Sequence, residues 1–414
     1  MIRIIRSSEA GTLLTRKAAR FDDAENAVRP IIEAVRTRGD AAVREYAAKF
    51  DDYQGNEFRI GASQIAQAAD RLSPQFRDAV LTAAASIRSF AELQVPQPFT
   101  RDIGPGIRAG QIVRPLDTVC GYIPAGRYPL PSTVMMTVIP AQVAGVRNVC
   151  ITSPRAVPEI LGTAGLLGGV EVYQLGGAHA IAAFAFGTET VPRADRIVGP
   201  GNIYVAAAKK LLAGEVGIDF VAGPTEILII ADDGNARWIA ADMLAQAEHD
   251  TDASAVLLTT SHALAEQVSA ELERQLPSLP TAAVAREAID RNSAIIIVDS
   301  PQEAVELSNR FAPEHLSLHD PSLLDAVQHA GSVFLGPLSP EAAGDYASGP
   351  NHVLPTTGAA RVRGGLSAAD YVKVISTQQL APEALSRLCP AVTTLARAEG
   401  LEAHARSMEV RLDA

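Results

Sequence analysis

The chain has 414 residues, 47% of them hydrophobic, so it is long enough for two or three globular domains and is not a disordered chain. Its formal net charge of -11 argues against nucleic-acid binding, which normally requires a basic face. No apolar run approaches the about 18 residues of a membrane span, and the N-terminus lacks the apolar core of a signal peptide. The three scattered cysteines indicate a reducing compartment, so we expect a cytoplasmic protein with no nucleic-acid or membrane partner.

The first hundred residues predict helices, because 24–50 and 74–93 carry helical apolar spacing. From about residue 110, short β-branched runs alternate with Ala-rich helices. The first set of predicted strands is 117–123, 148–152, 170–175 and 196–199, with helices at 132–145, 158–167, 178–187 and 201–213. The second set is 226–231, 254–260, 294–299 and 332–335, with helices at 235–248, 262–276, 301–311 and 321–329.

This alternation predicts βαβ units and parallel sheets. We therefore predict an α/β fold of two Rossmann-like parallel-sheet domains with helical N-terminal and C-terminal extensions. The predicted ranges are an N-terminal extension packed on the body at 1–108, the two sheet domains at 109–224 and 225–360, and a dimerisation tail at 361–414. The terminal helices of that tail, from about 382 to 412, could cross to a second subunit.

Three strand ends could contact a dinucleotide. The glycine turns 176–179 and 199–202 each follow a predicted strand and open a helix, where backbone N–H groups could hold a phosphate or ribose. In the loop 121–127, Tyr122 could stack on a nucleotide ring. Neither glycine turn has the G-x-G-x-x-G fingerprint, and structural turns or an ordinary half-buried tyrosine explain these features equally well.

The stretch 242–250 is predicted to be the end of a helix. Gln246 and His249 are three residues apart, so both side chains could reach one divalent cation. Imidazole suits zinc or a similar transition metal. The alternatives are a helix end with a solvated acidic tail and, for His404 near the C-terminus, a solvated helix histidine.

Two further segments could carry chemistry. Glu314 and His315 lie on a Pro-initiated turn before a short apolar strand, and such a pair can handle protons near neutral pH. The predicted loop 341–352 contains Asp345, a candidate oxygen ligand, and His352, a candidate substrate contact. A surface turn for the first segment, and simple turn geometry for the second, remain open.

Together these motifs resemble the histidinol dehydrogenase family in order and spacing, from Phe50-Asp51 to His404. The resemblance is carried by the segments 122–124, 176–178, 199–202, 222–224, 246–249, 313–316, 344–349 and 351–355, and by the pair Glu399 and His404. It implies a zinc-dependent, NAD-linked enzyme that oxidises L-histidinol through the aldehyde to L-histidine. It also implies one zinc ion per subunit and a weak, unusual dinucleotide site.

The resemblance implies roles for individual residues as well. The catalytic pair would be Glu314 and His315, and the zinc ligands Gln246, His249, Asp345 and His404. The substrate would contact these ligands together with Thr225, His315, His352 and Glu399, and the dinucleotide would contact Tyr122, His179 and Asn202. Family members are homodimers with shared active sites, so each C-terminal segment, with Glu399 and His404, would complete the site of the other subunit.

Two positions depart from the family pattern. His179 stands where the family usually has Gln, and Thr225 stands where many members have Ser. The extra methyl group of Thr narrows the pocket, so an NAD-dependent dehydrogenase of another small amino alcohol or diol is the alternative. Glu399 favours a substrate with an ammonium group, because a carboxylate pairs with a cation.

The resemblance and the chemistry together suggest a mechanism. Zinc would orient the substrate imidazole and amine rather than activate hydroxide. His315 would take the proton in both oxidations, and Glu314 would activate the water that attacks the aldehyde. A non-catalytic metal-binding or nucleotide-binding protein on this scaffold would be expected to lose Glu314 or His315 first, and both are present.

Overall fold

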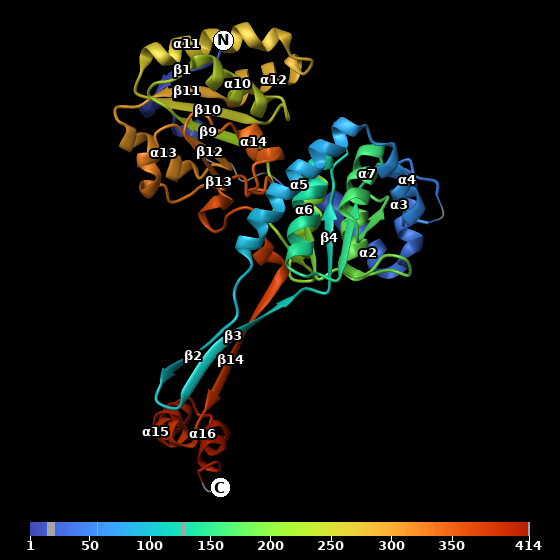
Figure 1. Ribbon diagram of the computed structural model, residues 1–414, viewed down its shortest axis with the longest axis vertical. Helices are drawn as coiled ribbons and strands as arrows, with labels where there is room; N and C mark the ends of the chain where they lie inside the picture. The colour runs from blue at the N-terminus through green and yellow to red at the C-terminus, as the bar shows by residue number, and fades with distance from the viewer. Residues whose placement is uncertain (15–20, 56, 126–128, 413–414) are drawn as a thin grey trace. The chain divides into compact units, whose positions relative to one another are not determined.

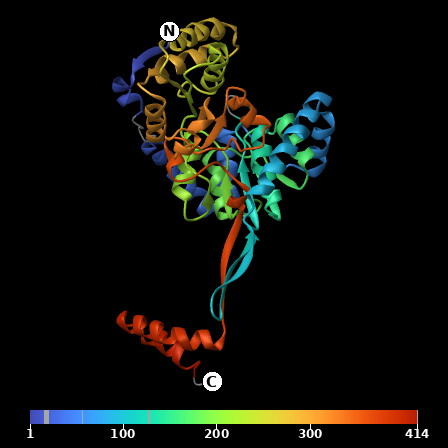
Figure 2. The same ribbon diagram turned by 60° about the vertical axis from the view of Figure 1, so that its left-hand side comes forward.

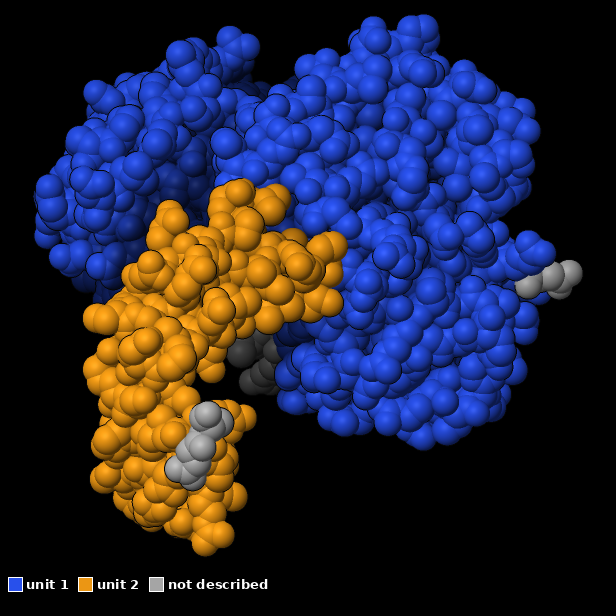
Figure 3. Space-filling model, turned by 60° about the horizontal axis from the view of Figure 1, so that its bottom comes forward, with its two compact units in different colours: residues 1–94, 116–371 blue, residues 95–115, 372–414 orange. Residues whose placement is uncertain are grey.

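The computed structural model describes residues 1–14, 21–55, 57–125 and 129–412. It divides into two compact units, drawn in blue and orange in Figure 3. Unit 1 comprises Met1–Gln94 and Leu116–Tyr371, and unit 2 comprises Val95–Pro115 and Val372–Ala414. Of the predicted loop 121–127, Gly126 and Arg127 lie outside the described residues.

The first sheet of unit 1, which contains the strand labelled β4 in Figure 1, has five parallel strands in the order β6-β5-β4-β7-β8. They are β4 (Thr118–Tyr122), β5 (Asn148–Thr152), β6 (Val170–Tyr173), β7 (Arg196–Val198) and β8 (Gly217–Ile218). Helices α8 (Gly177–Phe186) and α9 (Ile203–Leu212) cover one face, with α2 (Asp22–Arg38) and α3 (Asp40–Phe50) packed against them. The other face carries α6 (Pro131–Val143) and α7 (Pro158–Leu167), against which α5 (Pro74–Gln94) and α4 (Ala62–Arg71) pack.

The second sheet has six parallel strands in the order β1-β11-β10-β9-β12-β13. They are β1 (Arg3–Arg6), β9 (Glu226–Ile230), β10 (Ser254–Thr259), β11 (Ala294–Ile297), β12 (His315–Leu318) and β13 (Ser332–Leu335). Helices α10 (Ala236–Ala247), α11 (His262–Gln275) and α12 (Ala282–Asn292) share a core with one face, and α13 (Pro301–Phe311) with the other. Successive residues of β9 are buried on alternate faces, as expected for a strand covered on both sides.

The two parallel sheets confirm the predicted fold class. In each, the first strand of the repeat lies next to the second strand on one side and the fourth on the other, as in a Rossmann sheet. The chain therefore reverses direction across each sheet between β4 and β7, and again between β9 and β12. Ligands usually bind at such switch points. The four predicted domain ranges remain a prediction.

Several local predictions were wrong. The predicted helix 24–50 is broken into α2 and α3 at Gly39, whose φ of +53° favours glycine. The predicted helix 321–329 is a short 3-10 helix, η3 (Pro321–Ala326). Strand β1 was not expected, because its partner Ala294–Ile297 lies far along the chain. The remaining short elements of unit 1 are η1 (Ser7–Glu9), α1 (Gly11–Leu14), η2 (Leu276–Ser278), α14 (Glu341–Tyr346), η4 (Ala359–Arg361) and η5 (Ala368–Tyr371).

Unit 2 is built from an internal segment and the C-terminal segment of the chain. Strands β2 (Phe99–Gly104), β3 (Ile107–Pro115) and β14 (Val372–Leu380) form an antiparallel sheet in the order β14-β3-β2. They run side by side and lead to α15 (Pro382–Ala398) and α16 (Glu402–Glu409) (Figure 2). The sequence predicts helices near 382–412 but none of these strands, since β3 and β14 pair over a large separation. No helix in the described part of the chain is both long and apolar enough to cross a membrane.

A buried ion pair anchors the turn that follows β7. The side chains of Lys209 and Asp219 are 2% and 0% exposed and contact each other directly. Lys209 donates to the carbonyl of Gly199 at 3.0 Å, and the Asp219 carboxylate accepts from the backbone N–H of Gly199 at 2.7 Å. Gly199 has a φ of +103°, and a Cβ there would lie 2.4 Å from the carbonyl oxygen of Tyr122. The pair therefore holds a turn that only glycine can form.

We expect Lys209→Met to lower the free energy of unfolding by about 3–5 kcal/mol, because it leaves the Asp219 carboxylate buried without its counter-ion. Urea unfolding followed by circular dichroism measures the loss. The matched control is Lys210→Met, one residue further on the same helix, where the ion pair with Glu25 leaves half of the Lys210 side chain exposed. Equal losses in the two variants would show that the buried ion pair contributes no more to the free energy of unfolding than the exposed one.

Candidate active site

The candidate catalytic pair lies at the amino ends of two neighbouring strands. Thr225 directly precedes β9, Glu314 directly precedes β12, and His315 is the first residue of β12. Because β9 and β12 are paired in register, Oε2 of Glu314 accepts from the Thr225 hydroxyl at 2.5 Å and from the Glu226 N–H at 2.9 Å. Burial raises the pKa of Glu314. Glu314 and His315 thus lie in a buried, hydrogen-bonded site and not in the surface turn that was the alternative.

The end of α10 brings Gln246 to the same place. Gln246 is fully buried, and its Nε2 donates to the hydroxyl of Thr225 at 2.7 Å. Its Oε1 is also buried but has no hydrogen-bond partner among the described residues. The helix ends at Ala247, so His249 follows the helix and is exposed, contrary to the prediction that both side chains lie on it. His249 is still close enough to oppose the rise that burial causes in the pKa of Glu314.

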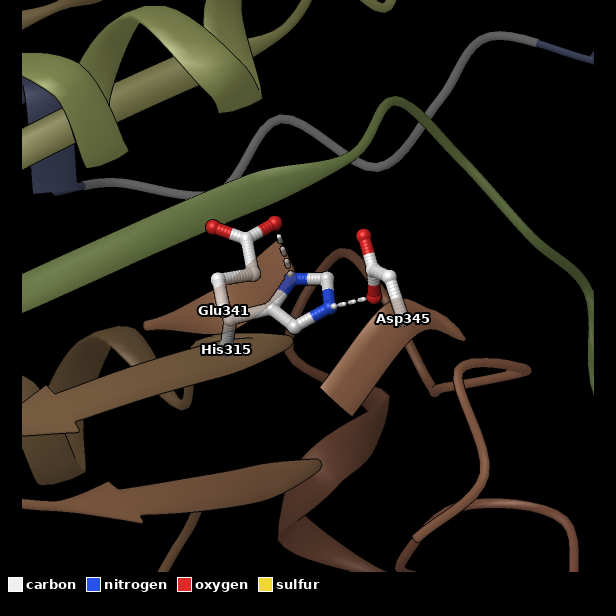
Figure 4. Close-up of side chains that lie close together, drawn as sticks. All are labelled: His315, Glu341 and Asp345. Atoms are coloured by element: carbon white, nitrogen blue, oxygen red, sulfur yellow. Dashed lines mark ion pairs between the residues drawn. The ribbon is translucent and has the colours of Figure 1, made fainter. Parts of the chain in front are cut away.

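His315 is surrounded by carboxylates on two sides (Figure 4). Its Nδ1 lies 3.2 Å from the carbonyl oxygen of Glu226, 3.5 Å from Oε1 of Glu341 and 3.6 Å from Oε2 of Glu314. Its Nε2 lies 3.5 Å from Oδ1 of Asp345. Burial lowers the pKa of His315, but Glu341, Glu314 and Asp345 outweigh it and raise the pKa to about 10. A divalent cation held beside this ring would oppose that rise.

The segment 341–352, predicted to be a loop, begins with the short helix α14 and only then becomes irregular. On α14, Glu341 and Asp345 are one turn apart and both face His315 (Figure 4). Glu341 was not singled out from the sequence. Its signal was present, because an acidic residue after Pro340 and four residues before a candidate ligand predicts a shared helix face.

Asp345 and His352 are joined through the backbone. Nδ1 of His352 lies 2.7 Å from the carbonyl oxygen of Asp345, and its Nε2 lies 3.2 Å from the hydroxyl of Thr133. Burial lowers the pKa of His352, although the Asp345 carboxylate opposes this. For Asp345, burial favours the neutral acid, but the contact with His315 and the nearby histidines lower its pKa. The segment 341–352 thus contributes both a carboxylate, Asp345, and an imidazole, His352, to the site.

The donor set fits a divalent metal ion. An amide oxygen that is buried without a partner, as in Gln246, is costly unless something else binds it. Asp345 supplies a carboxylate, and the exposed His249 is close enough to act on its pKa. Among the described His, Cys, Asp and Glu residues, ligand atoms of His315, Glu341 and Asp345 lie within 4.8 Å of one another, and His249 is not part of this cluster. The predicted ligand set of Gln246, His249, Asp345 and His404 therefore remains a prediction, and the proximity of Glu341 was not expected.

Two predicted site residues belong to unit 2. Glu399 and His404 are both exposed there. The sequence places them on one helix, but α15 ends at Ala398 and α16 begins at Glu402, with Gly400 at a φ of +76° between them. Glu399 is therefore the C-cap residue of α15, and His404 lies in the first turn of α16.

The three predicted dinucleotide contacts line one cavity of about 720 Å³ at the carboxyl ends of β4 and β5. Its lining includes Tyr122, His179 and Asn202, together with Asp51. The Tyr122 hydroxyl accepts from the N–H of Gly177 at 3.1 Å. Nε2 of His179 lies 2.9 Å from Oδ2 of Asp51. The cavity lies beside the switch point between β4 and β7, where a Rossmann sheet binds its ligand.

Asn202 and His179 are each held firmly. The Asn202 side-chain oxygen caps α9 by accepting from the N–H groups of Tyr204 and Val205. His179 is fully buried, and its Nδ1 has no hydrogen-bond partner in the described part of the chain. The cavity thus has the size and the location for a nucleotide, with a free imidazole nitrogen in its lining.

The comparisons of high similarity with known proteins identify one family. The histidinol dehydrogenase family model matches residues 14–412. Histidinol dehydrogenase of Thermus thermophilus is 48% identical over 99% of this chain and 100% of its own length, and that of Bacillus cereus is 47% identical over 94% and 92%. The crystal structure of histidinol dehydrogenase from Elizabethkingia anophelis superposes with a TM-score of 0.95 at 38% identity, covering 100% of this chain and 98% of that one.

Sequence and fold agree along the whole length of the molecule, and the chain therefore belongs to the histidinol dehydrogenase family, whose members are oxidoreductases.

Proposed function

We propose that the protein oxidises L-histidinol through the aldehyde to L-histidine, with zinc and NAD, as the named activity of its relatives suggests. One observation carries the proposal. A buried imidazole, His315, has an Nε2 without a hydrogen bond, and a carboxylate, Glu314, lies beside it at the amino edge of the second sheet. Gln246, Asp345 and His352 converge on the same place.

His315 acts as the base in both oxidations. Its Nδ1 can only donate to the carbonyl of Glu226, so the lone pair of the neutral ring lies on Nε2. Nε2 can then take the proton of the substrate hydroxyl, and later that of the aldehyde hydrate. The carboxylates near the ring stabilise the imidazolium that forms.

Glu314 activates the water that attacks the aldehyde. Its Oε2 accepts two hydrogen bonds, from Thr225 and Glu226, so the carboxyl group is held in one orientation. Burial raises its pKa, which makes it a stronger base than a solvated carboxylate. Thr225 carries a methyl group in addition to this hydroxyl, which would narrow the space available to the substrate.

Zinc and NAD have separate places in this proposal. Gln246, His249 and Asp345, together with His404 of the other subunit, would hold zinc, which when bound orients the substrate imidazole and amine. Tyr122, His179 and Asn202 would hold NAD, which when bound accepts a hydride in each oxidation. Because Nε2 of His179 lies 2.9 Å from Oδ2 of Asp51, a dinucleotide bound here would meet a fixed imidazole rather than a flexible amide.

The alternative is an NAD-dependent oxidation of another small amino alcohol or diol. Thr225 narrows the pocket, which favours this alternative for a smaller substrate. Glu399 favours a substrate with an ammonium group over an anionic diol. A panel of amino alcohols and diols, compared by kcat/KM, distinguishes these substrates, and the proposal requires L-histidinol to have the highest value.

We also propose a homodimer with shared sites, in which His404 and Glu399 act in the other subunit. The Ala, Arg and Glu residues around Glu399 and His404 predict little apolar surface on the terminal helix. Unit 2 nevertheless exposes apolar side chains on its strands and helices, namely Phe99, Ile103, Val374, Ile375, Leu380, Val392, Leu395, Leu401, Val410 and Leu412. So much exposed apolar surface on a small unit is typical of a protein interface.

A cytoplasmic location is supported by the three cysteines, which are all buried and unpaired.

The first prediction separates the two halves of the reaction. His315→Asn is expected to slow oxidation of both L-histidinol and its aldehyde by about 10²–10⁴-fold, because one base serves both steps. Glu314→Gln should slow aldehyde oxidation more, since water activation belongs to that half alone. NADH formation from each substrate measures the two rates. Equal losses in both halves for Glu314→Gln would contradict the assigned role.

The second prediction concerns the metal. His249→Ala should lose bound zinc without a shift in the unfolding transition, because His249 is exposed after the helix end. Gln246→Ala should lose zinc and also about 1–3 kcal/mol of unfolding free energy, since it removes a buried hydrogen bond to Thr225. Zinc content is measured by atomic absorption, and chelation should abolish turnover that zinc restores. Full activity in metal-free protein would refute zinc dependence.

The third prediction tests the shared site. His249→Ala and His404→Ala should each be inactive alone. Mixed under subunit exchange, they form heterodimers in which one site carries both defects and the other carries none. Recovered activity should approach about a quarter of wild type at random assortment of a two-fold dimer. No recovery, with exchange shown by mass spectrometry of tagged subunits, would place His404 in the site of its own subunit.

A further inference from the structure

The end of β5 lacks the acidic residue that a Rossmann sheet usually carries beside its nucleotide. Strand β5 ends at Thr152, and the next residues are Ser153, Pro154 and Arg155. In a Rossmann fold, a carboxylate near this point binds the ribose 2′-hydroxyl of NAD, whereas an arginine accommodates the 2′-phosphate of NADP. Arg155 is exposed and lines the cavity, and its side chain makes no hydrogen bond or ion pair with a described residue. The strand end alone would therefore favour NADP.

Both carboxyl groups in the described lining of the cavity come instead from the end of α3. Asp51 is the C-cap residue of that helix, and Asp52 follows it. Oδ2 of Asp51 accepts from the N–H of Gly176 at 2.8 Å and lies 2.9 Å from Nε2 of His179. The Asp51 side chain is only 6% exposed. Asp51 is thus fixed by contacts within the protein.

Asp52 has no such contacts. It is exposed, and its side chain makes no hydrogen bond or ion pair with any residue that the structure describes. Its φ of +53° lies in the left-handed region, which side chains other than those of asparagine and aspartate rarely adopt. Such conformations cost free energy and cluster at ligand sites. The chain therefore places a carboxylate at the wall of the cavity without a structural role for it among the described residues.

Two aromatic side chains indicate which part of a ligand would lie near Asp52. Phe50, which directly precedes the two aspartates, and Tyr204 line the cavity and are 55% and 50% exposed. Exposed aromatic rings bind nucleotide bases by stacking. A purine stacked on Phe50 would bring its ribose next to the aspartates, because the ribose is bonded directly to the base.

Several backbone N–H groups that could bind a phosphate at this cavity are already occupied. At the start of α8, the N–H groups of Gly176 and Gly177 donate to Asp51 and Tyr122. At the start of α9, the side chain of Asn202 accepts from two N–H groups. Helix N-termini are the usual backbone sites for a phosphate. An additional phosphate group in this part of the cavity would therefore have to be bound by side chains.

We propose that Asp52 selects the dinucleotide: its carboxylate accepts hydrogen bonds from the ribose hydroxyl groups of the adenosine half and rejects a 2′-phosphate, so the cavity takes NAD and not NADP. This inference rests on the proposed function for the presence of a dinucleotide. A ribose hydroxyl can donate to a carboxylate, whereas a phosphate group carries about two negative charges at neutral pH and is repelled by Asp51 and Asp52. The exposed guanidinium of Arg155 supplies one positive charge, which solvent and salt screen.

The binding test compares wild type with Asp52→Asn, because asparagine has the same shape, lacks the charge and tolerates a positive φ. Calorimetry measures the Kd of NAD and of NADP without turnover. We expect NADP to bind wild type about 10²-fold more weakly than NAD, and this ratio to fall about tenfold in Asp52→Asn, as the loss of one nearby like charge predicts. A ratio of two Kd values measured on one preparation does not depend on the fraction of protein that is folded.

Two control variants separate Asp52 from the overall charge and from Arg155. Asp70→Asn removes an exposed carboxylate on α4, outside the cavity lining, and should leave the ratio unchanged. Arg155→Ala should weaken NADP further and leave NAD preferred, because it removes a cation that favours the phosphate. As competitors of NAD, adenosine 5′-monophosphate and adenosine 2′,5′-bisphosphate should show the same preference, since they differ only at the ribose 2′ position.

The outcomes separate this inference from the proposed function. An unchanged ratio in Asp52→Asn would overturn the inference, and so would a wild type that prefers NADP or that binds neither dinucleotide. Oxidation of L-histidinol with NAD in the same preparation tests the proposed function. If wild type fails to oxidise L-histidinol but its preference for NAD depends on Asp52, the proposed function falls and the inference stands.

Discussion

The chemistry of this molecule depends on one constraint: several carboxyl groups are buried around a single imidazole. Such groups are stable in a protein interior only when hydrogen bonds or opposite charges accompany them. Glu314 is satisfied by the hydroxyl of Thr225 and the N–H of Glu226, which the register of β9 and β12 brings within reach. Glu341 and Asp345 are instead paired with His315. Together with Glu314, they raise the pKa of His315 to about 10, although burial acts to lower it. The pairing of β9 and β12 thus positions Glu314 and His315, and the surrounding carboxyl groups influence the pKa of His315.

The two sheets of unit 1 use opposite edges. In the first, the cavity lies where β4 and β5 end, the usual location for a nucleotide. In the second, Thr225 and His315 lie where β9 and β12 begin, next to the end of α10 that carries Gln246. Helix carboxyl ends and strand amino ends meet at this edge, because each helix runs back antiparallel to its strands. The cavity and the cluster around His315 therefore lie at different sheet edges because βαβ geometry offers two distinct edges.

Local patterns were sufficient for the elements whose signals lie within a few residues. The alternation of β-branched runs and Ala-rich helices predicted both parallel sheets, and the paired Glu314 and His315 were identified because adjacent charged residues need partners. Pairings over long separations could not be predicted this way. Strand β1 joins β11, and β14 joins β3, only because tertiary packing brings them together. Glu341 was missed for a similar reason, since its proximity to His315 depends on the packing of α14 against β12.

Charge balance explains why a neutral amide is a sensible ligand here. Glu314, Glu341 and Asp345 already place three carboxyl groups around His315, and a fourth at position 246 would add repulsion in a buried site. Gln246 offers an oxygen without a charge. Burial raises the pKa of Glu314, and it raises that of Glu341 to about 8, so the cluster favours a positive charge beside these groups. A neutral amide at position 246 adds no further negative charge, and a proton on His315 supplies a positive one.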